Sequence, residues 1–387
     1  MAEMYRSLGV SPVINAAGTL TRLGGSRMPP AVVAALADAA GSFVDLVGLQ
    51  RAVGERIASM TRNEACYVSS GAAAGIAQSV AACIAGSDPE RLAAFPHPPE
   101  PREVVVFASQ RNGYDYAARM TGARLVEVND EPGALDSAIT DRTACILWFA
   151  GAHYAAGALP LAEVVAAARR RRVPVLVDAA AQIPPVASLW QFTREIGADI
   201  AIFSGGKGLR GPQSAGLVLG RRDIVEACRL NGSPNFGFGR PMKVGKEELV
   251  GMLAAVEWTL SQDEPSQLAG YEASVERWII GLEGIPGVIA ERGYPSEAGQ
   301  PHGRTIVHFS APCRWSGEAL ATALWEMDPR IAVDTVSGDG IALNPQTLEV
   351  GEDIIVLNAL LHFLVQQPDD GVPAGFDGNA GKPERSA

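Results

Sequence analysis

The feature that most constrains the fold of this 387-residue chain is an alternation of two kinds of segment between about residues 64 and 220. Short runs of β-branched and other apolar residues alternate with alanine-rich stretches of helical character. Several runs are apolar almost throughout, which indicates strands covered on both faces, and the helical stretches between them favour a mostly parallel α/β sheet. The runs are ACYVS at 65, EVVVFAS at 103, ARLVEV at 123, TACILWF at 143, VPVLVDA at 173, DIAIFSG at 199 and AGLVLG at 215.

The segments that flank this block follow a different order. Residues 29–61, before it, carry apolar residues at helical spacing and predict packing helices. After it, two predicted helices over 246–260 and 271–285 precede the predicted strands GRTIVHFS, RIAVDTV and GIALNP, with the helix SGEALATALWEM among them. We therefore expect an N-terminal segment over 1–45 that packs on the active site, a large domain over 46–244, a small α+β domain over 245–366 and a disordered tail over 367–387.

Composition excludes several classes of function. The net charge is −11, which disfavours nucleic acid as a partner. The arginines at 169–172 stand at the end of a predicted helix, and positive charges are favourable at a helix C-terminus. No apolar run approaches the roughly 20 residues that span a bilayer, and the N-terminus lacks the pattern of a secretory signal. The five cysteines include no CxxC pair and the five histidines no metal-ligand spacing. We expect a cytoplasmic protein with reduced thiols and without a metal or membrane partner.

Two opposite charges follow neighbouring predicted strands. Asp178 ends the run VPVLVD, and Lys207 follows the run DIAIF, inside the glycine-rich stretch SGGKG. Ligands of α/β sheets gather beyond the carboxyl ends of the strands, so both side chains are predicted at the functional edge. A plain ion pair at a strand end, or a solvated loop lysine, remains an alternative interpretation.

A third feature is the segment YVSSGAAAGIAQ, which reads as a strand, a turn and a helix. Small residues at the turn leave the backbone N–H groups of the first helical turn free for an anion, and the hydroxyls of Ser69 and Ser70 add donors. The segment lacks the lysine of a P-loop and the GxGxxG of a dinucleotide site, so ATP and NAD fit poorly. A serine N-cap without a ligand is the structural alternative.

Together the three features match the requirements of pyridoxal 5′-phosphate (PLP). Its aldehyde is held as a Schiff base by a lysine amine, its ring nitrogen is kept protonated by a carboxylate, and its phosphate is anchored by a helix N-terminus. On this interpretation the glycines beside Lys207 give the cofactor room to approach the backbone, and Ser204 supplies another phosphate donor.

The stretches SSGAAAG, VLVDAAAQIPP and SGGKGLRGPQSAGLVLG, with NFGFGRPMKVGKEELVGMLAAVE behind them, resemble the selenocysteine synthase-like group of fold type I PLP enzymes. That group includes seryl-tRNA selenium transferase and shorter relatives such as D-glucosaminate-6-phosphate ammonia-lyase. The resemblance implies an aspartate aminotransferase-like fold, a mostly parallel large domain with a smaller α+β domain, and active sites between the subunits of a homodimer or higher homo-oligomer. It implies Lys207 as the Schiff-base lysine and Asp178 as the partner of the ring nitrogen, with Ser70, Gly71 and Ala72 holding the phosphate.

Other residues are candidates for cofactor or substrate contacts. Many relatives place a His or Gln three residues after the aspartate, near the hydroxyl group of the PLP ring. Here Ala181 stands at that position, and Gln182, one place later, is the candidate for the role. Tyr114 is a candidate to stack on the ring, with Arg111 and Asn112 and a helix-core role for Tyr114 as alternatives. The candidates for substrate binding, each with an ordinary structural role as the alternative, are Arg240, Arg210, Thr19, Asn15 and His153.

The predicted function is PLP-dependent chemistry at Cα or Cβ of an amino acid or amino sugar acid, in which Lys207, released by the substrate amine, takes the Cα proton. The shorter relatives favour α,β-elimination of the ammonia-lyase type, with transamination or racemisation as alternatives on the same scaffold. Selenium transfer to seryl-tRNA is disfavoured by the acidic charge and by the position of INAAGT close to the start of the sequence. A catalytically silent protein that keeps the PLP scaffold is the alternative from another class.

Overall fold

The structure is a computed structural model that describes residues 3–365, so the predicted disorder over 367–387 lies outside the described residues. Of these, residues 19–268 and 295–301 form one compact unit, called here the large unit, and residues 3–18, 269–294 and 302–365 form the small unit. The predicted boundary near residue 245 falls inside the large unit, because α11 (Lys246–Ser261) packs on α2 (Pro30–Ala40) and α3 (Leu46–Met60).

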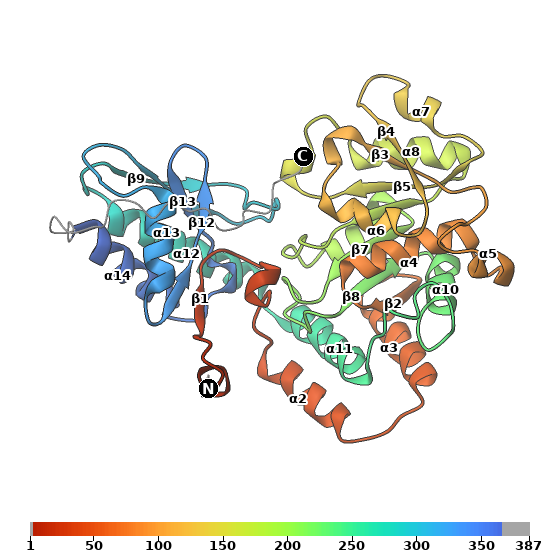
Figure 1. Cartoon of the computed structure of the whole chain (residues 1–387), viewed down its shortest axis with the longest axis horizontal. Coiled ribbons are helices and arrows are strands. Elements are labelled where there is room, and N and C mark those ends of the chain that lie inside the picture. Colours follow the sequence, from red (N-terminus) through yellow and green to blue (C-terminus); the bar gives the residue numbers. More distant parts are fainter. Residues whose placement is uncertain (1–2, 366–387) are drawn as a thin grey trace. The chain divides into compact units, whose positions relative to one another are not determined.

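The large unit is built on a seven-stranded sheet in the order β2-β8-β7-β6-β5-β3-β4 (Figure 1). All seven predicted strands are present, and only β8 runs antiparallel to its neighbours, which confirms the mostly parallel α/β prediction. The strands are β2 (Ala65–Ser69), β3 (Glu103–Phe107), β4 (Arg124–Val128), β5 (Thr143–Phe149), β6 (Val175–Asp178), β7 (Ile200–Ser204) and β8 (Gly216–Gly220).

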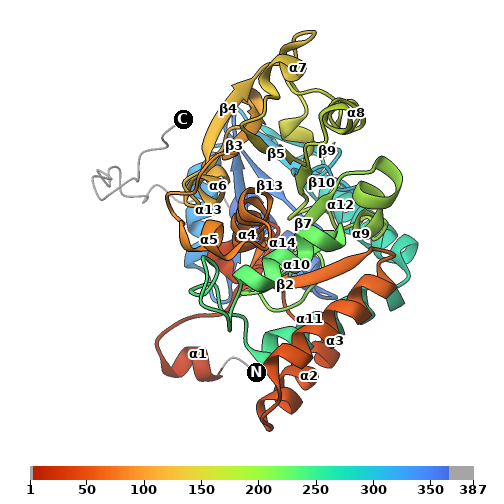
Figure 2. The ribbon, with the colours of Figure 1, turned by 90° about the vertical axis from the view of Figure 1, so that its right-hand side faces the viewer.

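Helices cover both faces of this sheet, as the apolar strands require. Alternate residues of β3 point to opposite faces, so Val104 and Val106 join the core under α4, α6 and α10, while Val105 and Phe107 join the core under α3, α8 and α11. Figure 2 shows α2, α3 and α11 side by side. The other helical segments of the large unit are η1 (Thr21–Leu23), α4 (Ala72–Ala85), α5 (Pro89–Ala93), η2 (Ala108–Gln110), η3 (Gly113–Asp115), α6 (Tyr116–Arg119), α7 (Ala134–Ala138), η4 (Ala152–Tyr154), α8 (Leu161–Arg171), α9 (Ser188–Trp190), η5 (Gln191–Ile196) and α10 (Arg222–Asn231).

The small unit has a four-stranded antiparallel sheet in the order β12-β13-β10-β9 and a parallel pair of β1 with β11. The predicted strand RIAVDTV is two strands, β11 (Arg330–Ala332) and β12 (Asp334–Val336). Two strands were not predicted, β1 (Val13–Asn15) and β9 (Val288–Gly293). The remaining elements are α1 (Glu3–Ser7), β10 (Arg304–Phe309), α13 (Gly317–Glu326), β13 (Gly340–Leu343), η6 (Pro345–Thr347) and α14 (Glu352–Val365), while α12 (Glu264–Leu282) begins in the large unit and continues into this one.

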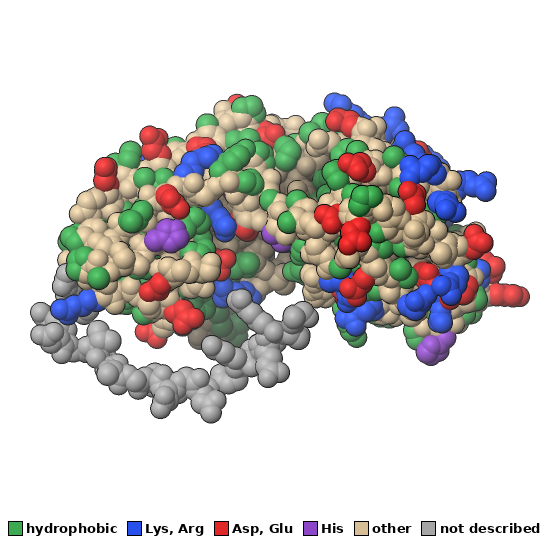
Figure 3. Space-filling model, turned by 90° about the horizontal axis from the view of Figure 1, so that it is seen from above, with side chains coloured by type: hydrophobic (Ala, Val, Ile, Leu, Met, Phe, Trp, Pro, Cys, Tyr) green, Lys and Arg blue, Asp and Glu red, His purple; other side chains and the backbone are tan. Residues whose placement is uncertain are grey.

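Three surface and side-chain features bear on the sequence predictions. Acidic and basic side chains are interspersed on the face of the molecule shown in Figure 3. All five cysteines are free thiols, of which Cys66, Cys145 and Cys228 are buried. Within residues 3–365, no helix is both long and apolar enough to cross a bilayer.

Candidate active site

Asp178 and Lys207 lie at the same edge of the large sheet. Asp178 is the last residue of β6 and aligns with Ile202 of the neighbouring β7, and Lys207 follows shortly after β7 ends at Ser204. The two side chains are close enough that the charge of each changes the pKa of the other. The structure therefore brings together the two residues on which the sequence prediction depends.

Burial controls the electrostatics of this pair. It raises the pKa of the Asp178 carboxyl, and a hydrogen bond from the Ala180 N–H to Asp178 Oδ1 (3.0 Å) and the Lys207 charge oppose that shift. Burial lowers the pKa of the Lys207 amine, while the negative charges of Asp178 and Glu297 oppose that shift. A desolvated lysine exists as the neutral, nucleophilic amine more readily than a solvated one, as a residue that condenses with an aldehyde requires.

The glycines around Lys207 allow close packing within the protein, which corrects the prediction that they make room for a cofactor. A Cβ on Gly206 would lie 2.5 Å from Gln213 Cα, and one on Gly208 would lie 2.0 Å from the carbonyl oxygen of Ile183. Since both neighbours are backbone atoms, neither glycine tolerates a side chain without a shift of the loop.

The N-terminal part of the large unit forms hydrogen bonds to the backbone of the Lys207 loop. Ser26 Oγ donates to the carbonyl oxygens of Gly206 (3.0 Å) and Lys207 (2.7 Å), and the Ser26 N–H donates to Gly206 O (2.9 Å). Gln213 Nε2 also donates to Thr21 O (3.0 Å). These bonds fix the backbone from which the Lys207 side chain extends.

The turn between β2 and α4 fits a phosphate group. Gly71 adopts a φ of +86°, and no atom lies within 4 Å of the position that a Cβ on it would take. No side chain caps the N-terminus of α4, so its first N–H groups, from Ala72 onward, are available to an anion. Ser69 is buried, and its Oγ donates to Gly71 O (2.9 Å), so it shapes the turn from within.

Sheet register brings Ser204 to the same turn. Ser69 of β2 aligns with Gly216 of β8, and Gly216 aligns with Ser204 of β7. A Cβ on Gly216 would lie 2.8 Å from the Gly71 carbonyl carbon and 2.9 Å from the Ala72 nitrogen. A lysine after β7, a carboxylate at the end of β6 and an uncapped helix N-terminus after β2 thus lie at the same edge of the large sheet, and these residues fit PLP.

Tyr154 is a member of this site that the sequence analysis missed. It lies in η4, after β5, whose Phe149 aligns with Asp178. Burial raises the pKa of the Tyr154 phenol, and the charges of Asp178 and Tyr114 raise it further. The ring of His153, a predicted site residue, lies 3.9 Å from that of Tyr154 between centroids. The sequence feature that could have identified Tyr154 is its position in the loop after β5, the strand next to β6.

Two predicted cofactor contacts have other interactions in the structure. Gln182 Nε2 donates to the carbonyl oxygens of Ala298 (2.8 Å) and Ala150 (3.4 Å), so its amide group joins two segments. Tyr114 is 58% exposed and lies close enough to Tyr154 to influence the pKa of the Tyr154 phenol. The ring-hydroxyl role of Gln182 and the stacking role of Tyr114 stay predictions.

The predicted substrate residues are divided between the two units. Arg210 donates from Nε to Arg27 O (2.7 Å) and lies over the Trp258 ring. Arg240 is exposed, with its guanidinium carbon 5.8 Å from the centroid of Phe236. Asn15 belongs to the small unit, where its Nδ2 donates to Gly18 O (2.8 Å) and its Oδ1 accepts from the Ala17 N–H (2.9 Å). Thr19, partly buried, begins the large unit.

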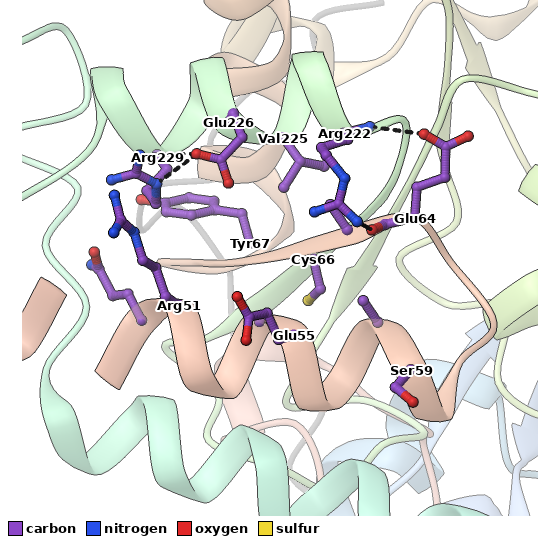
Figure 4. Close-up of a pocket in the computed structure, with 14 residues that line it drawn as sticks. Arg51, Glu55, Ser59, Glu64, Cys66, Tyr67, Arg222, Val225, Glu226 and Arg229 are labelled. Atoms are coloured by element: carbon purple, nitrogen blue, oxygen red, sulfur yellow. Dashed lines mark hydrogen bonds and ion pairs between the residues drawn. The ribbon is translucent and has the colours of Figure 1, made fainter. Parts of the chain in front are cut away.

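A separate cavity of about 470 Å³ lies between α3, α10 and β2, the strand at one end of the sheet order (Figure 4). Arg229 forms an ion pair with Glu226 (2.9 Å). The Arg222 backbone N–H donates to the Glu64 carboxylate (3.2 Å), and the Arg222 guanidinium donates to the Glu64 backbone carbonyl (2.5 Å). Its lining shares no residue with the Lys207 site. Among residues 3–365, no group of three or more His, Cys, Asp or Glu side chains is arranged to hold a metal ion.

Comparison with known proteins supports the same assignment. Residues 109–236 match the aminotransferase class-V family model. The chain is 37% identical to 5′-C-glycyluridine monooxygenase-decarboxylase from Streptomyces sp., over 96% of this chain and 94% of that protein. It is 34% identical to D-glucosaminate-6-phosphate ammonia lyase from Salmonella typhimurium, over 80% and 83% of the two chains. A solved structure of D-glucosaminate-6-phosphate ammonia-lyase superposes with a TM-score of 0.80 and 30% identity, covering 92% of this chain and 96% of that one.

The chain belongs to the fold type I PLP-dependent enzymes. More distant matches to L-seryl-tRNA(Sec) selenium transferases, at 26 to 27% identity, confirm the predicted likeness to the selenocysteine synthase-like group. PLP is the cofactor of this enzyme.

Proposed function

We propose that this PLP-dependent enzyme eliminates water from a β-hydroxy-α-amino acid and releases ammonia and a keto acid. The observation that carries the proposal is the meeting of the desolvated Lys207 amine and the buried Asp178 carboxyl beside the uncapped N-terminus of α4. In such an elimination the Cα–H and Cβ–O bonds break, the hydroxyl leaves as water, and a second water hydrolyses the product to the keto acid and ammonia.

Each residue has one task in this proposal. Bound PLP supplies an electron-withdrawing ring that stabilises negative charge at the substrate Cα. Lys207 holds the PLP aldehyde and, once freed by the substrate amine, accepts the Cα proton at Nζ. Asp178 keeps a proton at the ring nitrogen. Ser70, Gly71 and Ala72 hold the phosphate, with the Ala72 N–H as donor, since the Gly71 N–H donates to Ser69 O (3.0 Å). The hydroxyl of Ser204, which aligns with Gly216 as Ser69 does, helps to hold it.

The substrate class follows from what the relatives' names have in common. Read as chemical names, glucosaminate, glycyluridine and seryl-tRNA each contain an amino-acid unit with oxygen on the carbon next to Cα. We propose the same unit for the substrate of this chain, with Arg240 and Arg210 as candidates to bind its carboxylate or a phosphate. Thr19, Asn15 and His153 stay predicted substrate contacts.

A second candidate function is oxidative decarboxylation of the same class of substrate. It is favoured by the 37% identity, over 96% of this chain, to a monooxygenase-decarboxylase. Transamination and racemisation use the same Lys207 chemistry and differ only in where the proton returns. A catalytically silent scaffold is disfavoured, because a protein without turnover has no chemical need for a desolvated lysine beside a buried carboxylate.

The first test asks whether Lys207 binds the cofactor. The purified wild-type protein is expected to show the visible absorption of lysine-bound PLP, and borohydride should remove it. Lys207→Ala should abolish this absorption, while Asp178→Asn should retain bound PLP and lower kcat by about 10²- to 10⁴-fold. Wild-type protein that stays colourless after incubation with PLP would overturn the proposal.

The second test separates the candidate reactions. Ammonia, keto acid, carbon dioxide and oxygen uptake are measured on β-hydroxy-α-amino acids and phosphorylated amino sugar acids, in air and under argon. Elimination predicts equal amounts of ammonia and keto acid under both gases. Oxygen consumption matched by carbon dioxide release would replace elimination by oxidative decarboxylation, and a keto acid that forms only with an added amino acceptor would indicate transamination.

We further propose a homo-oligomer, a homodimer or larger, with active sites between subunits, and a cytoplasmic location. The oligomer is supported by Phe236, which is 96% exposed on the loop that carries Arg240. The location is supported by the five cysteines, all of them free thiols, a state that a reducing compartment maintains.

A further inference from the structure

The cavity between α3, α10 and β2 has the size of a small-molecule site. Its volume of about 470 Å³ lies within the range of roughly 300 to 1,000 Å³ that is usual for ligand pockets. β2 is the last strand at this end of the sheet, so no further strand covers its outer edge. Gly54 of α3 packs directly on this edge, since a Cβ on it would lie 2.5 Å from Cys66 O. Close backbone packing therefore fixes one wall of the cavity against its floor.

Two of the charged side chains that line the cavity have no partner in the part of the chain that the structure describes. Three arginines and three glutamates line it, and four of these six side chains belong to residues that interact with one another in two pairs. Within residues 3–365, the Arg51 guanidinium and the Glu55 carboxylate form neither an ion pair nor a hydrogen bond. They stand one helical turn apart on α3, a spacing at which opposite charges can pair. An unpaired cation and an unpaired anion thus line the same cavity.

The cationic end of the cavity suits a carboxylate. Figure 4 shows the guanidinium groups of Arg51, from α3, and Arg229, from α10, pointing toward each other beside the Tyr67 ring. Tyr67 is 5% exposed, and its phenol oxygen accepts a hydrogen bond from Gln78 Nε2 (3.0 Å). Burial raises the pKa of Tyr67 to about 12, so at neutral pH the phenol keeps its own proton as a donor. Two guanidinium groups and a phenol bind a carboxylate through charge-assisted hydrogen bonds.

Glu55 supplies the opposite charge within reach of the same ligand. Its Cα lies about 6 Å along the helix from that of Arg51, since an α-helix rises by about 1.5 Å per residue. Figure 4 shows its carboxylate between α3 and β2. An α-amino acid carries a carboxylate and an ammonium group on one carbon, so a single molecule satisfies both unpaired charges. A simple anion would pair with Arg51 alone and would be repelled by the carboxylate of Glu55.

We propose that this cavity is a binding site for an α-amino acid, separate from the candidate active site. The ligand carboxylate lies between Arg51 and Arg229 and accepts from the Tyr67 hydroxyl, and the ligand ammonium group donates to Glu55. The inference is independent of the proposed reaction, because none of these residues takes part in it. A ligand at this position lies against β2, the strand that leads into the turn proposed to hold the PLP phosphate.

The probe for this site is N,N-dimethylglycine, because its tertiary amine keeps the positive charge but cannot condense with PLP. Isothermal titration calorimetry of the PLP-loaded enzyme should show one binding site per chain. Arg51→Gln and Glu55→Gln should each weaken binding about tenfold or more, as expected for the loss of a charged hydrogen bond. Arg171→Gln on α8 and Glu90→Gln on α5 remove exposed charges elsewhere in the same unit and should leave the affinity unchanged.

A second probe tests the requirement for both charges. Acetate carries the carboxylate without the amine and leaves Glu55 unpaired, so it should bind about tenfold more weakly than dimethylglycine, or weaker still. Equal affinities for the two probes would show a simple anion site and would overturn the inference. Binding that Lys207→Ala abolishes and Arg51→Gln leaves unchanged would place the probe beside Lys207, which also overturns it. So would the absence of saturable binding to wild type up to about 10 mM probe.

Discussion

Lys207 combines a stability cost with a chemical need. Burial lowers its pKa in the folded protein, so the folded state binds the proton less readily than the unfolded chain, in which lysine titrates near its ordinary value of about 10.4. At neutral pH the unfolded chain is protonated at this position, and folding must place the charge in a desolvated site. The amine is therefore retained for chemistry at the expense of stability.

Lys207→Met in the cofactor-free protein should for this reason increase the free energy of unfolding at pH 7, by about 0.5 to 2 kcal/mol. The sign follows from linkage. The lowered folded-state pKa penalises folding below it, and the penalty disappears as pH rises through the window between that pKa and the unfolded value. Urea unfolding of both proteins at several pH values measures the effect, and a difference that grew with rising pH would contradict it.

The sequence carried the identities of Lys207 and Asp178 because both follow apolar runs whose β character is local information. Tyr154 and Glu297 carried no such signal. Tyr154 stands within a loop, AHYAAG, with no periodic pattern. Glu297 belongs to the short segment Pro295–Pro301, which joins the large unit although it lies between two strands of the small unit. The packing role of the glycines beside Lys207 could not be predicted from the sequence either. It depends on the carbonyl oxygen of Ile183, which lies 25 residues before Gly208 in the chain.

At the scale of elements, the site depends on how closely β8 packs against the start of α4. Gly216 is the contact point, because its Cβ would lie 2.8 Å from the carbonyl carbon of Gly71. The backbone N–H donors proposed to hold the phosphate belong to the same turn. A small displacement of α4 therefore changes the direction in which these N–H bonds point. The sequence predicted the strand–turn–helix and the strand AGLVLG at 215, but not that the turn and this strand touch at Gly216.

Gly216→Ala should weaken PLP binding about tenfold or more, since each lost or misdirected hydrogen bond to a charged group is worth about 1.5 to 3 kcal/mol. PLP titration of the cofactor-free variant, followed by visible absorbance, measures the dissociation constant. Gly270→Ala is the matched control, because no atom lies within 4 Å of its Cβ position in α12, and a helical alanine should raise stability slightly. Equal PLP affinities in Gly216→Ala and wild type would show that the turn does not hold the cofactor.

At the scale of the whole molecule, two exposed aromatic side chains on the large unit support the proposed homo-oligomer and are candidates for its interface. Phe43 precedes α3 and is fully exposed, and Phe236 is 96% exposed on the loop after α10. Gln50 Nε2 of α3 donates to Ser233 O (2.9 Å), which fixes this loop against the helix that Phe43 precedes. Burial of one phenylalanine contributes about 1.5 to 3 kcal/mol, so two copies of this surface supply a substantial part of a dimer interface.

Phe236→Asp should therefore weaken self-association, with a dissociation constant raised about tenfold or more in sedimentation velocity across a dilution series. Arg240 belongs to the same loop, so the specific activity of the wild-type protein should fall on dilution. In the variant this fall should begin at a higher protein concentration than in wild type. Val350→Asp places the same charge on an equally exposed side chain of the small unit and should leave association unchanged. A wild-type protein that stays monomeric and fully active at every concentration would show that each chain completes its own active site, and Arg240 would then act, if at all, within its own subunit.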